Sequence, residues 1–258
     1  MRHIADICRD MASRLGIGLC SQPDGEYCID RIYDDPRGVI CVATRSGMGK
    51  TTFTLDVTLE RAMHSDRAVV IITCEKSTEQ ITAELVMKLC GMSICFINDE
   101  KKQKLSQAFS YLSKLNIYIK EYDPEEPPSL DEVERLVGMF DNAGLVMIDG
   151  LYCVWDEVPL KKAEQKIENL KRISKKSGAP IIITTYYDRA EIKRMLSGDM
   201  SKNFLLKGGF DRLVVLYRSM VGTTMNPIAK YLVAEPNGEY KLSALRYDQK
   251  RRNFSRNA

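Results

Sequence analysis

Short apolar runs alternate with longer amphipathic segments through most of the chain, and this alternation predicts the fold class. The apolar runs have the length of strands and lie at Val39–Ala43, Ala68–Thr73, Ile117–Ile119, Leu145–Ile148, Pro180–Thr185 and Leu213–Tyr217. The amphipathic segments between them predict helices at Lys50–His64, Thr78–Cys90, Glu100–Lys114, Ser129–Asn142 and Lys161–Ser177. Strands that alternate with helices are typical of an α/β protein, so we predict a mostly parallel, twisted sheet flanked by helices.

The two ends of the chain follow other patterns. Tyr231–Ala234 and Tyr240–Ala244 are joined through Pro-Asn-Gly at 236–238 and predict a closing β-hairpin near the C-terminus. Near the N-terminus an apolar stripe predicts a short helix, formed by Ile4, Ile7, Cys8, Met11 and Leu15. This helix either packs on its own domain or is a linker helix that docks on a neighbouring subunit. We therefore divide the chain into a linker helix and connection, residues 1–35, and one large domain, residues 36–258.

The composition is that of a soluble globular protein, because 44% of the 258 residues are hydrophobic and 28% are charged. No apolar run approaches the roughly 18 residues that a membrane-spanning helix needs. The N-terminal stretch MRHIADICRDMASRL has no uninterrupted apolar core. We therefore predict no signal peptide, no association with a membrane and a cytoplasmic location.

The cysteines and histidines do not form the pattern of a zinc site. The eight cysteines include no Cys-x-x-Cys pair, and His3 and His64 are the only histidines. Cys41, Cys74 and Cys153 lie in or beside apolar runs, where a thiol packs as a small hydrophobic group. We predict neither a zinc site nor a disulfide framework.

Positive charge is concentrated toward the C-terminus. The net charge is +3, but the segment after residue 187 has twice as many Lys and Arg residues as Asp and Glu residues, and the rest is slightly acidic. A basic cluster on one face would favour binding to nucleic acid. The alternative is a solvated terminal segment.

Residues 43–52, ATRSGMGKTT, lie between the first predicted strand and the first long predicted helix, and they predict a phosphate-binding loop. In such a turn several backbone N–H groups and the helix N-terminus point at one anion. Lys50 supplies a charge for the β- and γ-phosphates, and the hydroxyl of Thr51 is a Mg²⁺ ligand. Thr44 replaces the first glycine of the usual pattern, but that glycine mainly shapes the turn. The predicted nucleotide-binding residues are Arg45, Ser46, Gly47, Met48, Gly49, Lys50, Thr51 and Thr52.

Two carboxylates follow predicted strands. Asp149 ends the run that begins at Leu145, a position typical of the acid that orients Mg²⁺ in such nucleotide sites. Glu75 follows Ala68–Thr73 and is either a catalytic base beside an attacking water or an exposed loop glutamate. The pattern predicts a metal site at Thr51 and Asp149 and leaves the role of Glu75 open.

Together these residues resemble the C-terminal ATPase domain of bacterial replicative DNA helicases of the DnaB type, in the RecA-like superfamily, over roughly residues 27–255. The family's loop Ala-Arg-Pro-Ser-Met-Gly-Lys-Thr is matched by Thr44–Thr51. Its Glu-Met-Ser-x-Glu-Gln is similar to Glu75–Gln80, and its Val-Ile-Asp is similar to Met147–Asp149. Its late strand ending in Tyr-Arg resembles the run up to Arg218, and its closing Phe-Asp…Arg-Phe resembles Tyr247-Asp248…Asn253-Phe254.

The resemblance implies a RecA-like P-loop NTPase fold for residues 36–258, with ATP and Mg²⁺ as ligands. It implies that Glu75 is the catalytic base beside Lys50 and that Arg218 belongs to the nucleotide site. It also implies single-stranded DNA as a partner and self-association into a ring or filament. The DNA contacts would come from Lys202 and Lys207, because lysines beside flexible glycines can follow a phosphate backbone. The alternative for these lysines is a mobile surface loop.

Several positions depart from the family's pattern. The family has Ser-Gln-Leu-Asn-Arg with a glutamine that senses the nucleotide state, whereas residues 185–189 read Thr-Tyr-Tyr-Asp-Arg, so that Tyr186 replaces the glutamine. The family's basic hairpin Lys-Gln-Arg-Asn-Gly corresponds to Ala234–Gly238, which has no basic group. Lys250, Arg251 and Arg252 are candidates for a substitute basic finger.

These departures favour an alternative function, a nucleotide-binding switch or accessory factor of replication or recombination with weak or no unwinding activity. The full set of loop and carboxylate residues favours an ATPase motor instead. A third interpretation, a metabolic P-loop kinase, lacks an acceptor-site or lid signature. Residues 1–35 are also too few for the helical N-terminal domain of full-length helicases of this type.

Overall fold

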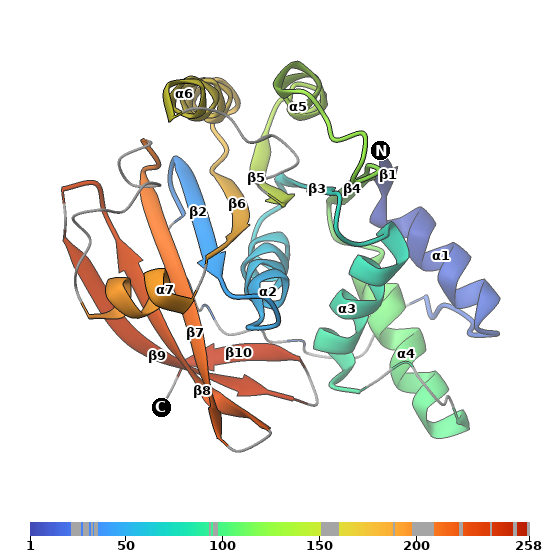
Figure 1. The fold of residues 1–258 in the computed structure, drawn as a ribbon. Coiled ribbons are helices and arrows are strands. Elements are labelled where there is room, and N and C mark those ends of the chain that lie inside the picture. Colours follow the sequence, from blue (N-terminus) through green and yellow to red (C-terminus); the bar gives the residue numbers. More distant parts are fainter. Residues whose placement is uncertain are drawn as a thin grey trace.

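The computed structural model describes residues 1–21, 27, 31, 33, 36–92, 94, 98–150, 160–187, 189–197, 209–221, 224–237, 239–249 and 252–256. In this part of the chain the strands form one ten-stranded sheet in the order β1-β4-β3-β5-β6-β2-β7-β8-β9-β10 (Figure 1). The strands are β1 (Arg2–His3), β2 (Val39–Thr44), β3 (Ala68–Thr73), β4 (Ile117–Glu121), β5 (Ala143–Asp149), β6 (Ile181–Tyr186), β7 (Arg212–Val221), β8 (Thr224–Ala234), β9 (Tyr240–Asp248) and β10 (Asn253–Arg256). The helices are α1 (Ile4–Arg14), α2 (Lys50–Met63), α3 (Thr78–Cys90), α4 (Asp99–Leu112), α5 (Leu130–Val137), α6 (Leu160–Ser177) and α7 (Arg189–Leu196).

The six strands from β4 to β7 in this order run parallel, so their carboxyl ends meet at one edge of the sheet. The antiparallel strands lie outside them, with β1 paired to β4 on one side and β8, β9 and β10 following β7 on the other. The predicted mostly parallel α/β fold is therefore confirmed. The predicted closing hairpin is also confirmed, because β8 and β9 pair from Ala234 opposite Tyr240.

Helices cover both faces of the parallel part of the sheet (Figure 1). The core on one face joins α1, α2, α3 and α4 to the sheet, and the core on the other face joins α5, α6 and α7 to it. The central strands β2, β3 and β5 are buried along their whole length, which explains their continuous apolar sequences. Among the described residues, no helix combines the length and apolar character needed to cross a membrane.

The N-terminal helix packs on its own domain. Four residues of its apolar stripe, Ile4, Ile7, Cys8 and Met11, are buried in the core shared with α3 and α4, and Leu15 is partly buried against that core. The assignment of residues 1–35 as a linker helix and connection stays a prediction. The predicted domain boundary near residue 35 also stays a prediction.

Some elements differ from the sequence prediction. The helix predicted over Ser129–Asn142 ends at Val137, where Gly138, a poor helix former, donates its N–H to the Glu134 carbonyl. Helix α7 and strands β1 and β10 were not predicted. All three are short, so their sequences are too brief to show a clear period.

Candidate active site

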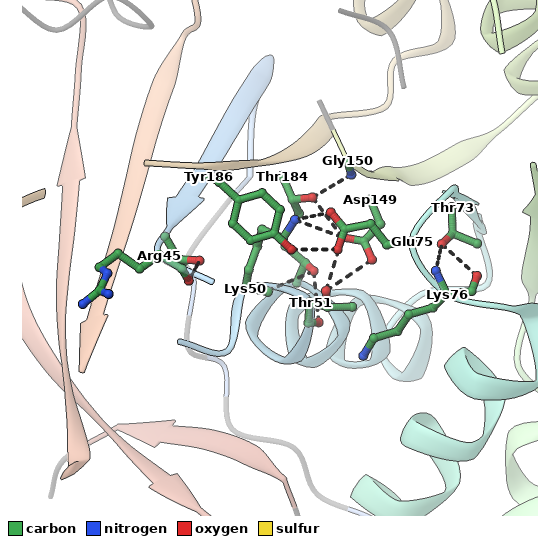
Figure 2. A network of polar contacts seen from close by, with 12 residues as sticks. Arg45, Lys50, Thr51, Thr73, Glu75, Lys76, Asp149, Gly150, Thr184 and Tyr186 are labelled. Carbon is green, nitrogen blue, oxygen red and sulfur yellow. Dashed lines mark hydrogen bonds and ion pairs between the residues drawn. The ribbon is translucent and has the colours of Figure 1, made fainter. Parts of the chain in front are cut away.

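Four parallel strands bring the predicted site residues to one edge of the sheet. Thr44 at the end of β2 lies in register with Tyr186 at the end of β6, and Thr73 at the end of β3 lies in register with Asp149 at the end of β5. Helix α2 begins directly in front of these ends (Figure 2). Residues from distant parts of the sequence thus converge where open α/β sheets bind ligands.

The loop between β2 and α2 has the backbone that a phosphate-binding turn requires. Gly47 and Gly49 have φ angles of 75° and 98°, which other residues rarely adopt. Gly49 is the residue directly before α2, and because glycine has no side chain it cannot cap the N–H groups of the first helical turn. Backbone N–H groups at a helix start and the positive end of the helix dipole favour an anion here.

Lys50 is surrounded by acceptors at the start of α2. Its Nζ donates to Oε1 of Glu75 at 2.6 Å and lies 4.0 Å from Oδ1 of Asp149. The same nitrogen lies 3.8 Å from the centre of the Tyr186 ring, within cation–π distance. The structure therefore places both predicted catalytic residues, Lys50 and Glu75, in direct contact (Figure 2).

Asp149 is fully buried behind Lys50 and is held by two threonines. The Thr51 hydroxyl lies 3.2 Å and 3.3 Å from its two carboxylate oxygens, and the Thr184 hydroxyl donates to Oδ1 at 2.9 Å. Thr184 in turn accepts the N–H of Gly150 at 2.8 Å. Burial raises the pKa of Asp149, opposed by the nearby charge of Lys50. Thr184 was not predicted, and the signal that could have found it is its place near the end of a strand beside Asp149.

Glu75 lies on a turn that the local sequence fixes. The hydroxyl of Thr73 accepts the N–H of Lys76 and donates to its carbonyl, which closes the turn after β3. Helix α3 then begins with a capping box formed by Ser77 and Gln80. The Glu75 side chain is only 15% exposed and its carboxylate contacts Lys50, so it is not an exposed loop glutamate.

Tyr186 completes the group at the position where the resembling family has glutamine. Its hydroxyl donates to Oε2 of Glu75 at 3.1 Å, while its ring faces Lys50. Partial burial and the negative charge of Glu75 raise the pKa of Tyr186 to about 12. The hydroxyl is therefore protonated at neutral pH and acts as a donor.

Comparison with known proteins agrees with this arrangement. Residues 35–255 match the family described as DnaB-like helicase C-terminal domain. The chain belongs to this family.

Among its relatives, this DnaB-like chain is 27% identical to the replicative DNA helicase DnaB of Buchnera aphidicola subsp. Schizaphis graminum over 245 residues, covering 85% of this chain and 52% of the relative. It is 23% identical to the replicative DNA helicase DnaC of Bacillus subtilis over 194 residues, covering 70% and 43% of the two chains. The chain thus spans about half the length of these relatives.

Solved structures share the fold. One of them, described as an ATPase domain, superposes with a TM-score of 0.71 at 19% identity, covering 86% of this chain and 85% of that one. A DnaB-like replicative helicase, solved in a study of its interactions with primase, has the same TM-score and identity, and the match covers 58% of its own chain. The predicted RecA-like fold is therefore confirmed.

Arg218 lies beside this DnaB-like site in a stack of flat groups. Its guanidinium is 4.2 Å from the centre of the Tyr247 ring, and its Nε donates to the Asn226 carbonyl at 2.8 Å. Tyr247 packs on Phe254, whose ring would come within 2.9 Å of a Cβ added to Gly49. Burial lowers the pKa of Arg218. The stack connects Arg218 to the phosphate-binding loop, and its contact with a nucleotide stays a prediction.

The remaining predicted residues have mixed surroundings. The side chain of Arg45 points away from the Asp149 cluster in Figure 2, and Ser46 is exposed at the tip of the loop. Met48 and Thr52 are buried. Lys202 and Lys207, predicted to contact DNA, lie outside the described residues, as do Lys250 and Arg251.

Proposed function

We propose that this chain is a Mg²⁺-dependent ATPase of the replicative-helicase type that acts on single-stranded DNA. The observation that carries the proposal is the convergence of Lys50, Thr51, Glu75 and Asp149 at the N-terminus of α2. A cation, a hydroxyl and two carboxylates around an anion-binding helix start are the groups that phosphoryl transfer requires.

The ligand-binding roles divide between the loop and two oxygen donors. Lys50 and the N–H groups of the loop would bind the β- and γ-phosphates. Thr51 and Asp149 would hold Mg²⁺, and their oxygens, 3.2 Å apart, fit an ion that prefers a few protein oxygens completed by water and phosphate. When bound, Mg²⁺ neutralises negative charge on the transferred phosphoryl group.

Glu75 would act as the general base for hydrolysis. A water oxygen attacks the γ-phosphorus, the bond between that phosphorus and the leaving ADP oxygen breaks, and the water proton passes to the Glu75 carboxylate. The contact with Lys50 supports this role, because Lys50 is the residue proposed to bind the γ-phosphate.

The nucleic acid partner and the assembly are proposed from the relatives. These relatives are named replicative DNA helicases, and one solved neighbour is described with primase. We propose contacts to single-stranded DNA through Lys202 and Lys207 and assembly into a ring or filament. Because the hairpin at Ala234–Gly238 lacks a basic finger, coupling of hydrolysis between subunits is expected to be weak.

One observation favours the alternative of a nucleotide switch with little unwinding. Glu75 is paired with Lys50 and bonded to Tyr186, so the base is engaged with the residue that must bind phosphate. A slow ATPase that responds to nucleotide without rapid turnover would fit this closed arrangement.

Steady-state ATP hydrolysis, measured with and without single-stranded DNA, tests the proposal. Wild type should hydrolyse ATP and be stimulated by DNA. Lys50→Ala should lose nucleotide binding, whereas Glu75→Gln should bind ATP and lose roughly 100-fold or more of its turnover. Tight ATP binding with slow turnover that ignores DNA would replace the motor by the switch, and unchanged turnover in Glu75→Gln would show that Glu75 is not the base.

A further inference from the structure

Lys50, Glu75 and Tyr186 form a closed set in which each side chain contacts the other two (Figure 2). The two donors use different oxygens of the carboxylate. Lys50 binds Oε1 at 2.6 Å, and the Tyr186 hydroxyl binds Oε2 at 3.1 Å. Removing either donor therefore leaves the other contact geometrically intact.

This division has a consequence for nucleotide binding. A γ-phosphate that binds Lys50 competes with Oε1 of Glu75 for the same ammonium group. Once phosphate has taken Lys50, the hydroxyl of Tyr186 still holds Oε2. Glu75 would then keep a fixed orientation while Oε1 is released to accept a proton.

We infer that Tyr186 is a positioning residue that holds Glu75 in place when a nucleotide phosphate displaces that carboxylate from Lys50. This inference rests on the proposed ATPase function, because it gives the contact between Tyr186 and Glu75 the role of orienting the general base. Tyr186 itself takes no proton and forms no bond to the nucleotide.

The position of Tyr186 suits this role and argues against a purely structural one. It is the last residue of β6, in register with Thr44 at the start of the phosphate-binding loop, so the backbone of the sheet fixes its distance from α2. The residue is 45% exposed, and removing its hydroxyl opens no buried cavity. A tyrosine hydroxyl is protonated at neutral pH, and partial burial beside Glu75 and Asp149 raises the pKa of Tyr186 further.

The test separates turnover from binding. Tyr186→Phe keeps the ring over Lys50 and removes only the donor to Glu75. It should lower kcat about tenfold, a fraction of the roughly 100- to 10,000-fold that a positioned base contributes, and leave the affinity for a fluorescent ATP analogue within about twofold of wild type. Tyr186→Gln supplies an amide N–H donor and should retain more turnover than Tyr186→Phe.

A matched control and a double variant sharpen the result. Tyr240→Phe removes the same hydroxyl from an exposed tyrosine of β9 that lines a different cavity, and its turnover should equal that of wild type. Glu75→Ala removes the competitor for Lys50 and should bind the analogue more tightly. Adding Tyr186→Phe to Glu75→Ala should change kcat no further, because the two residues act through one contact.

The possible results distinguish the two proposals. Equal kcat in wild type and Tyr186→Phe, or a loss confined to analogue affinity, would overturn the role of Tyr186 and leave the ATPase function standing. A wild type that shows no turnover above Lys50→Ala would overturn the proposed function, and the positioning role would fall with it.

Discussion

Two lysine–carboxylate pairs involve helix α2, and they differ in what surrounds them. Lys50 and Glu75 meet at 2.6 Å and Lys88 and Asp56 meet at 2.7 Å, so the contacts themselves are nearly identical. Both side chains of the Lys88–Asp56 pair are fully buried, whereas those of Lys50 and Glu75 are 4% and 15% exposed. The same kind of ion pair is therefore closed to solvent at Lys88–Asp56 and accessible to an incoming phosphate at Lys50–Glu75.

The hydrogen bonds of the buried pair are complete. Lys88 Nζ donates to Asp56 Oδ1 and to the carbonyls of Thr52 and Arg252, at 2.7, 3.2 and 2.7 Å, which uses all three of its protons. Asp56 accepts the N–H of Phe254 at 2.8 Å through its other oxygen. Burial raises the pKa of Asp56 to about 6 and lowers the pKa of Lys88, opposed in both by the partner charge.

This buried pair joins α2 and α3 to β10. The strand it secures carries Phe254, which packs on Phe53 and against Gly49 of the phosphate-binding loop. We conclude that the Lys88–Asp56 pair holds the C-terminal strand against the nucleotide site. The Lys50–Glu75 pair is the exchangeable pair, because an incoming phosphate can replace Glu75 as the partner of Lys50.

Breaking the buried pair should have the largest effect on stability. Lys88→Met leaves the Asp56 charge without its counter-ion in the core, so we expect a loss of about 3–5 kcal/mol in the free energy of unfolding. Chemical denaturation followed by circular dichroism measures this loss. Lys102→Met makes the same substitution in an exposed pair with Asp99 and should leave the unfolding midpoint nearly unchanged. Equal midpoints for both variants would show that the buried pair does not fasten the fold.

The two pairs also differ in how far the sequence predicts them. The phosphate-binding loop is contiguous, and Asp149 and Glu75 follow apolar strands, so local patterns are enough to propose them. The central strands and long helices could be predicted for the same reason, because each has its own period.

The Lys88–Asp56 pair has no such local signal. Its partners are 32 residues apart, and the Arg252 carbonyl is 164 residues from Lys88. A lysine and an aspartate on helices are usually exposed to solvent. Here both side chains are fully buried where α2, α3 and the C-terminal segment around β10 meet. The orientation of Tyr186 toward Glu75 likewise depends on strands that are adjacent in space and distant in sequence.

Removing the charge of the exchangeable pair should cost much less stability. In Glu75→Gln the Lys50 ammonium keeps Asp149 at 4.0 Å and the ring of Tyr186 as neighbours. We therefore expect a loss of about 1 kcal/mol or less in the free energy of unfolding. Thermal unfolding of Glu75→Gln and of Lys88→Met, each measured against wild type, compares the two losses in stability. A destabilisation as large as that of Lys88→Met would mean that the Lys50–Glu75 pair is also a structural fastening.

The smallest expected effect is a pH dependence of the Lys88→Met destabilisation. The pKa of Asp56 in the folded protein, about 6, exceeds its ordinary value of 3.8, so this group lowers stability as the pH rises through that window and has no further effect above it. Without Lys88 the folded-state pKa rises further, because burial is no longer opposed by the lysine charge. The variant should then go on losing stability between pH 6 and pH 8, where the Asp56 contribution in wild type changes only slightly.

Urea denaturation of both proteins at pH 6 and pH 8 measures this difference. The gap in unfolding free energy between wild type and Lys88→Met should be wider at pH 8. Glu75→Gln leaves Asp56 and Lys88 in place, so its gap from wild type should not widen for this reason. If the gap for Lys88→Met is the same at both pH values, Asp56 is already ionised at pH 6 without its partner. The size of the gap, rather than its pH dependence, would then measure what the buried pair contributes to stability.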